Sequence, residues 1–205
     1  RRYLESFPHD AQAVSILGLA YFDMKDYPSC VATLEHAIEL DPSATHTLEN
    51  LAKARFLMED YLGARRVYLQ LLGTDENNVE ILTGVALCER ELGHHENALG
   101  LLEKAIVTEP HRAESHFFYA NVLRDVREFQ AAIDAYEAAI TLNPEYLEAY
   151  VNCASSLKDI GKLAEAMAFY DAALKIDPDH AEANYNRALA LLSEMKLASG
   201  WRLYE

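Results

Sequence analysis

The stretch that decides the fold is residues 112–144, RAESHFFYANVLRDVREFQAAIDAYEAAITLNP, because a closely similar stretch follows it. Residues 146–178 read YLEAYVNCASSLKDIGKLAEAMAFYDAALKIDP, and Pro178 lies 34 residues after Pro144. Pro110 precedes Pro144 by the same interval. Similarity at one fixed period indicates an array in which each repeat folds as the same small motif.

The period divides the chain into repeats of 34 residues when this proline is taken as position 32. The register holds without insertion, so it predicts one continuous array over 1–205 as a single domain. The array has five full repeats, at residues 11–44, 45–78, 79–112, 113–146 and 147–180. Residues 1–10 are the tail of a preceding repeat, and residues 181–205 are a partial sixth repeat.

Apolar and small residues recur at helical spacing within each repeat. Positions 4, 7, 8 and 11 share one face of a first helix, and positions 20, 24, 27 and 28 share one face of a second. Small residues at positions 8 and 20, such as Ala120 and Ala132, allow the two helices to approach closely. Gly93 and Gly161 at position 15 suit the turn between them. The pattern predicts an all-α fold of stacked antiparallel helical hairpins.

These features resemble the tetratricopeptide repeat (TPR). The small residues at positions 8, 20 and 27 and the proline at position 32 carry the resemblance, which covers the whole chain. Glu76 and Leu71 depart from it, at positions where proline and alanine are usual. The resemblance implies a right-handed α-solenoid and a protein-interaction scaffold that binds a partner polypeptide segment in a concave groove.

Composition and charge narrow the classes of partner and compartment. The formal net charge of −15 disfavours nucleic acid and anionic membrane surfaces. No apolar run reaches the length of a membrane span, and the first residues lack the apolar core of a secretory signal. Three widely spaced cysteines indicate a reducing compartment, so we predict a cytoplasmic location. The absence of an initial Met predicts that the chain begins inside a longer one.

The resemblance places first-helix positions 2, 5, 6, 9, 12 and 13 on the concave face. Asparagine amides at these positions can donate to and accept from the backbone of an extended peptide. Aromatic side chains beside amides suit recognition of a protein segment. The predicted partner-binding residues are Asn50, Phe117, Phe118, Asn121, Arg124, Asp125, Asn152, Lys158, Asp159, Tyr185 and Asn186.

Acidic residues recur at position 13, near the end of the first helix. Asp125 and Asp159 are two of them, and Asp23 and Glu91 are the others. A carboxylate there interacts unfavourably with the helix dipole, so a binding role that favours basic partners is one interpretation. The alternative is a solvated rim, in which neighbouring cations offset the acids.

Two narrower resemblances bear on the asparagines. Asn121 followed by Asn152 is similar to half of the carboxylate clamp in chaperone-binding repeats, although Phe117 stands where that clamp has lysine. Asn50, Asn152 and Asn186 are similar to the asparagine ladder of O-linked N-acetylglucosamine transferases. Ile16, Gly84 and Phe118 interrupt that ladder, so residues of the fourth to sixth repeats are the better candidates.

The sequence contains no motif for catalysis. Its eight histidines show no metal-ligand spacing, and no nucleophile elbow, phosphate-binding loop or dinucleotide-binding glycine pattern occurs. We therefore predict a non-enzymatic chain without metal or cofactor. Two alternatives remain open: a substrate-presenting arm of a glycosyltransferase whose catalytic domain follows this chain, and a module that self-associates through exposed end repeats.

Overall fold

The computed structural model describes residues 10–202, and the side chains of residues 10–193. Every regular element in this range is an α-helix, so the predicted all-α fold is confirmed. The helices are α2 (Ala11–Asp23), α3 (Tyr27–Leu40), α4 (Thr45–Leu57), α5 (Tyr61–Leu72), α6 (Val79–Glu91), α7 (His95–Thr108), α8 (Ala113–Asp125), α9 (Phe129–Leu142), α10 (Leu147–Asp159), α11 (Leu163–Ile176) and α12 (Ala181–Arg202).

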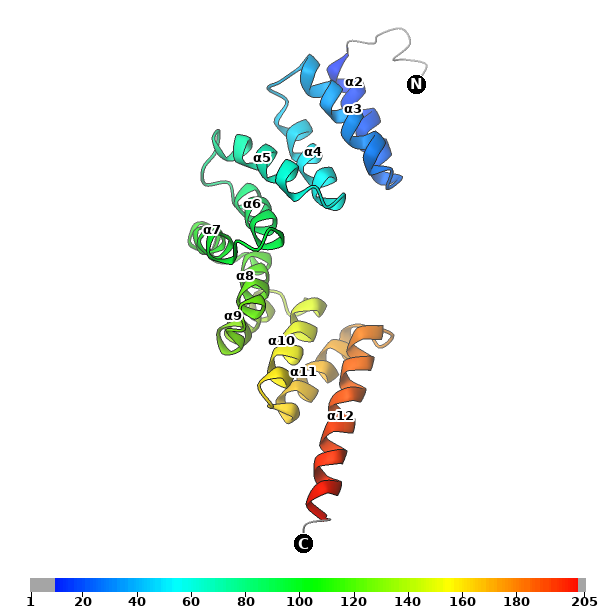
Figure 1. Ribbon diagram of the computed structural model, residues 1–205, viewed down its shortest axis with the longest axis vertical. Helices are drawn as coiled ribbons and strands as arrows, with labels where there is room; N and C mark the ends of the chain where they lie inside the picture. The colour runs from blue at the N-terminus through cyan, green and yellow to red at the C-terminus, as the bar shows by residue number, and fades with distance from the viewer. Residues whose placement is uncertain (1–9, 203–205) are drawn as a thin grey trace. The chain divides into compact units, whose positions relative to one another are not determined.

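The helices form two compact units, divided between Thr108 and Glu109. The N-terminal unit contains α2 to α7, and the C-terminal unit contains α8 to α12. Within each unit, successive helices form antiparallel hairpins, and each hairpin packs on the next in chain order (Figure 1). This consecutive packing is the predicted α-solenoid architecture. The assignment of 1–205 to a single array stays a prediction.

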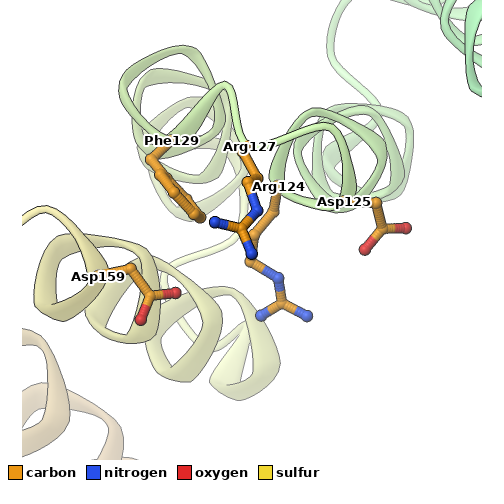
Figure 2. A pocket seen from close by; sticks show the side chains of 5 residues that line it. All are labelled: Arg124, Asp125, Arg127, Phe129 and Asp159. Carbon is orange, nitrogen blue, oxygen red and sulfur yellow. The ribbon is translucent and has the colours of Figure 1, made fainter.

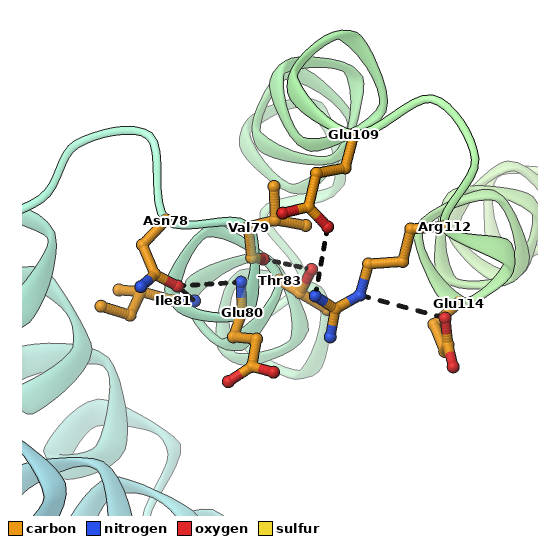
Figure 3. Close-up of polar contacts among 8 residues, drawn as sticks. All are labelled: Asn78, Val79, Glu80, Ile81, Thr83, Glu109, Arg112 and Glu114. Carbon is orange, nitrogen blue, oxygen red and sulfur yellow. Dashed lines mark hydrogen bonds and ion pairs between the residues drawn. The ribbon is translucent and has the colours of Figure 1, made fainter.

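Side-chain caps mark the starts of several helices. The carboxylates of Asp10, Asp26 and Asp60 accept hydrogen bonds from backbone amides in the first turns of α2, α3 and α5. Asn78 caps α6, since its Oδ1 accepts from the backbone amides of Glu80 at 3.1 Å and Ile81 at 3.2 Å (Figure 3). These caps satisfy amide groups that have no partner inside the helix.

The turn inside each hairpin requires a left-handed residue at position 15. Gly93 and Gly161 have φ values of 80° and 81°, as the sequence led us to expect. Lys25, Glu59 and Arg127 adopt the same conformation, with φ values of 58°, 62° and 66°. This conformation is costly for residues with a Cβ atom, so sequence reasoning did not identify these three as turn residues.

Small and large buried residues interlock in the cores of both units. Ala52, Ala120 and Ala154 at position 8 are completely buried, as are Ala132 and Ala166 at position 20. A Cβ atom at Gly18 would lie 2.5 Å from Leu34 Cδ2, so this glycine is required for close packing in the first hairpin. The three cysteines are free and buried, which confirms their interpretation as small apolar residues.

Candidate functional site

An amide pair links two neighbouring repeats of the C-terminal unit. Asn121 on α8 is 7% exposed, and its Oδ1 accepts a hydrogen bond from Tyr136 Oη on α9 at 2.6 Å. The same Oδ1 accepts from Asn152 Nδ2 on α10 at 3.0 Å. The structure thus brings together two of the predicted site residues, and a buried tyrosine fixes their orientation.

The hydrogen bonds leave a defined donor and a defined acceptor. An amide oxygen has two lone pairs, and both of those on Asn121 Oδ1 are used. No residue with a described side chain bonds to the Asn121 Nδ2 group or to the Asn152 Oδ1 atom. The amide pair therefore offers an N–H donor and a C=O acceptor, which match the C=O and N–H groups of an extended backbone.

The next repeat contains a similar contact without an amide. Tyr170 Oη lies 3.0 Å from Ser155 Oγ, and both residues occupy the repeat positions that Tyr136 and Asn121 occupy one repeat earlier. Burial raises the pKa of the Tyr170 phenol, and the hydrogen bond with Ser155 acts in the opposite direction. A tyrosine at position 24 and a polar residue at position 9 are thus a recurring pair in this unit.

The two predicted aromatic residues on α8 lie in different environments. Phe117 is 8% exposed, and its ring centroid is 4.7 Å from that of Tyr146 and 5.9 Å from that of Tyr136. Phe118 is half-buried and meets Phe117 edge to face. The Phe117 ring therefore packs against Tyr136 and Tyr146, and its direct contact with a partner stays a prediction.

The remaining predicted residues are accessible to different degrees. Arg124, Asn152, Lys158 and Asn186 are half-buried, and Asp125 and Asp159 are exposed. Tyr185 on α12 is 64% exposed. Asn50 is half-buried on α4, in the N-terminal unit, whereas all the others belong to the C-terminal unit.

A polar depression lies beside the ends of α8 and α10. It has a volume of about 440 Å³ and is lined by Arg124, Asp125, Arg127, Phe129 and Asp159 (Figure 2). We name this site the arginine pocket. Sequence reasoning identified three of its residues but missed Arg127 and Phe129. The available signal was Arg127 at position 15, where two other repeats have glycine.

A buried carboxylate in the N-terminal unit was also missed. The Glu89 side chain is 4% exposed and accepts from Arg65 Nε at 2.7 Å, while His94 Nδ1 lies 2.7 Å from its other oxygen. Glu89 occupies position 11, which the helical pattern assigns to the core. A charged residue at a core position was the signal, because burial of a carboxylate requires partners.

The buried thiols offer little chemistry. Burial, followed by the nearby Glu137 carboxylate, raises the pKa of Cys153 to about 12, and burial raises the pKa of Cys88 to about 12 as well. The thiolate is the reactive form, so these side chains are poor nucleophiles and ligands near neutral pH. In the described residues, no three His, Cys, Asp or Glu side chains are arranged to hold a metal ion. None of the described helices has the length and apolar character needed to cross a membrane.

Comparison with family models gives a consistent result along the chain. A model described as tetratricopeptide repeat matches residues 49–117, 119–181 and 154–199. A second model with the same description matches residues 11–43.

Similar curated proteins include two plant organizing proteins. Hsp70-Hsp90 organizing protein 2 from Arabidopsis thaliana is 30% identical over 95 residues, which is 45% of this chain and 17% of that protein. The Hsp70-Hsp90 organizing protein from Triticum aestivum is 31% identical over 85 residues, or 42% of this chain and 15% of that protein. The chain thus spans less than a fifth of these relatives' length.

Solved structures share the fold at low sequence identity. A thermophilic TPR protein from Thermus thermophilus has a TM-score of 0.72 and 22% identity, covering 89% of this chain and 99% of that one. YrrB, described as a TPR protein with an unusual peptide-binding site, has a TM-score of 0.65 and 19% identity, covering 91% of this chain and 96% of that one.

Proposed function

The chain belongs to the tetratricopeptide repeat family, whose members are protein-interaction scaffolds, and we propose that its C-terminal unit binds an extended segment of a partner polypeptide. In this proposal the amide pair, Asn121 and Asn152, bonds to one residue of the partner's main chain. The scaffold itself is non-catalytic. The observation that carries the proposal is the fixed donor and acceptor that the amide pair leaves unused.

Main-chain recognition explains why a buried tyrosine holds the site. Tyr136 donates to Asn121 Oδ1, so the Asn121 amide group cannot rotate without losing that bond. A preorganised polar group loses little conformational freedom when a ligand binds. The relatives support the class of function: one solved structure is described as having a peptide-binding site, and the curated relatives are named for organizing two other proteins.

Charge favours a basic segment as the partner. The formal net charge of −15 attracts a cationic polypeptide over long distances. Asp125 and Asp159 are exposed at the ends of α8 and α10, in the same unit as the amide pair. We therefore propose a partner segment whose overall charge is positive.

Backbone-modified peptides test this function directly. A random-peptide library is panned against the chain, and a selected peptide is synthesised with single N-methyl groups at successive backbone amides. If Asn152 Oδ1 accepts one peptide N–H, one N-methyl group should weaken binding by about fivefold, since a hydrogen bond of this kind contributes about 1 kcal/mol. The same N-methyl group should have no further effect on Asn152→Ala.

Two variants separate binding from folding. Asn121→Ser keeps a hydroxyl that can accept from Tyr136, at the position of the hydroxyl contact between Ser155 and Tyr170, but removes the amide donor. Ser155→Ala removes the equivalent contact one repeat later and serves as the control. The proposal expects weaker binding in Asn121→Ser and Asn152→Ala only. Equal binding by all three variants, with helicity retained, would contradict it.

Self-association is a second candidate, favoured by one observation. On α12, the side chains of Tyr185, Leu189 and Leu192 are 64%, 37% and 55% exposed. Large exposed apolar side chains can pack on a second copy. We expect a concentration-dependent dimer by sedimentation equilibrium that Leu192→Glu abolishes. A constant monomer mass would reject this candidate. The glycosyltransferase arm stays a hypothesis.

A further inference from the structure

We propose that the arginine pocket binds the carboxylate of one acidic side chain within the partner segment, an inference that rests on the proposed function. Arg124 and Arg127 carry it. Neither guanidinium forms an ion pair or hydrogen bond with any described residue, although both line the same depression. Figure 2 shows both side chains reaching into this space, with the Phe129 ring beside them.

Most other arginines with described side chains are paired. Arg65 binds Glu89 at 2.7 Å, Arg187 binds Asp171 at 2.5 Å, and Arg112 lies 3.5 Å from Glu109 (Figure 3). Arg55 and Arg90 also contact carboxylates. In a protein with many more acids than bases, two unpaired guanidiniums in one depression are a specific exception. A bound carboxylate would supply the missing partner.

The arginine pocket lies next to the amide pair. Arg124 follows Asn121 by three residues on α8, so the two side chains lie on the same face about one helical turn apart. Asp159, which lines the pocket, lies two turns beyond Asn152 on α10. A segment held at the amide pair therefore extends toward the pocket when it runs along the two helices to their C-terminal ends.

The charged residues that line the pocket favour a carboxylate ligand whose neighbours in the partner segment are basic. Two planar guanidiniums can each donate two parallel hydrogen bonds to an anion. Asp125 and Asp159 line the same depression, so a phosphate with two negative charges would meet two carboxylates. A glutamate or aspartate carries a single charge, and the pocket acids would attract basic residues on either side of it. The Phe129 ring offers an apolar surface for the methylene groups of that side chain.

The main-chain conformation of Arg127 allows a clean test. Its φ of 66° is matched by 80° at Gly93 and 81° at Gly161, so Arg127→Gly suits the backbone and removes the guanidinium. The test variant is Arg124→Gln/Arg127→Gly. The matched control is Lys25→Gly/Arg66→Gln in the N-terminal unit, because Lys25 is also left-handed and both double variants lose two positive charges.

The first measurement follows the arginine Nε–Hε resonances by NMR while N-acetyl glutamic acid amide is added. We expect saturable shifts of Arg124 and Arg127 in the wild type and in the control, and none with the glutamine analogue.

The second measurement pans the random-peptide library. Wild type and control should enrich Glu or Asp at one position with basic neighbours, and the test variant should not.

Synthetic peptides complete the test. Replacing the selected Glu by Gln should weaken binding to the wild type by about tenfold, as loss of a charge-assisted hydrogen bond predicts, and should leave binding to the test variant unchanged. Peptides that depend on the amide pair but show no acidic preference would overturn this inference alone. Peptides that require a free C-terminus would assign the pocket to a terminal carboxylate and overturn it too. Failure of the proposed function is distinct, since binding would then not depend on Asn121 or Asn152.

Discussion

The two compact units contain the same repeat but differ at position 11, which faces the core. The N-terminal unit has Tyr21, Arg55 and Glu89 there, and the two charged residues are each paired with an opposite charge. The C-terminal unit has Leu123 and Leu157, which are buried. Its internal polar contacts near the candidate site are uncharged, as in the hydrogen bond from Tyr136 to Asn121.

The two units also differ in which arginine side chains are available to bind a partner. In the N-terminal unit, the arginines at and beside the core are held by Glu35, Asp60 and Glu89, so they stabilise the fold. In the C-terminal unit, apolar packing and tyrosine hydroxyl groups replace those ion pairs. Arg124 and Arg127 of this unit have no ion-pair partner among the described residues and line an open pocket. The same repeat can thus use its cations for structure or for binding.

Removing the guanidinium of Arg65 should have the largest effect. Arg65→Met leaves Glu89, which is 4% exposed, without its closest cation. Loss of one partner from a buried ion pair costs about 3 kcal/mol, because the remaining charge stays desolvated. Chemical denaturation followed by circular dichroism would measure the change in the free energy of unfolding.

Two further variants make this comparison specific. Arg65→Met/Glu89→Leu places leucine at position 11, as in the C-terminal unit, and should recover most of the lost stability. Arg187→Ala breaks a more exposed ion pair in the C-terminal unit and should cost less than about 1 kcal/mol. Equal losses in the two single variants would show that the two units do not differ in how they use charge.

Position 6 provides the next comparison. The third repeat, in the N-terminal unit, has Gly84 there, whereas the second repeat has Asn50 and the fifth repeat, in the C-terminal unit, has Asn152. A Cβ atom at Gly84 would lie 2.6 Å from Tyr68 Cζ, so Gly84→Ala should displace the ring. We expect a loss of about 2 kcal/mol, because overpacking exceeds the gain in helix propensity.

The control for Gly84 is another helical glycine in the same unit. A Cβ atom at Gly100 on α7 would meet nothing within 4 Å. Gly100→Ala should therefore stabilise the chain by about 1 kcal/mol. If Gly84→Ala also stabilised it in thermal unfolding, the close contact with Tyr68 would not be what excludes an amide from this position.

The sequence predicted the fold well because the 34-residue period is repeated along the chain. Small residues such as Ala120 and Ala132 mark where helices meet, and the structure shows both completely buried. The site was predictable only in part. Asn121 and Asn152 occupy the expected positions, but their mutual hydrogen bond and the role of Tyr136 depend on side-chain orientation.

Arg127 was missed for a different physical reason. The spacing of apolar residues describes the helices, whereas this side chain projects from a turn. Its left-handed backbone is unusual for a residue with a Cβ atom, so its alignment with Gly93 and Gly161 at position 15 was the only indication of a turn residue. Glu89 was missed because position 11 was treated as apolar, although its charge could have indicated a buried pair.

The hydrogen bond from Tyr136 to Asn121 predicts a moderate effect in the C-terminal unit. Asn121→Ala removes the acceptor for both Tyr136 and Asn152 and should cost about 1.5 kcal/mol. Asn121→Ser should cost less, because a hydroxyl serves Tyr170 in the next repeat. Denaturant unfolding would compare the two, and an equal loss would mean that packing of the amide, rather than its oxygen, provides the stability.

Two buried serines in the C-terminal unit predict the smallest effects, with opposite signs. Ser115 and Ser156 are both completely buried, but Ser156 Oγ donates to the Asn152 carbonyl at 2.9 Å, whereas Ser115 Oγ has no partner among the described residues. Burial of an unpaired hydroxyl is unfavourable, so Ser115→Ala should raise the free energy of unfolding by about 1 kcal/mol. Ser156→Ala should lower it by about 0.5 kcal/mol, because a satisfied hydrogen bond is lost. Opposite shifts of the two unfolding midpoints would show that hydrogen bonding, and not burial alone, determines which polar groups this unit tolerates in its interior.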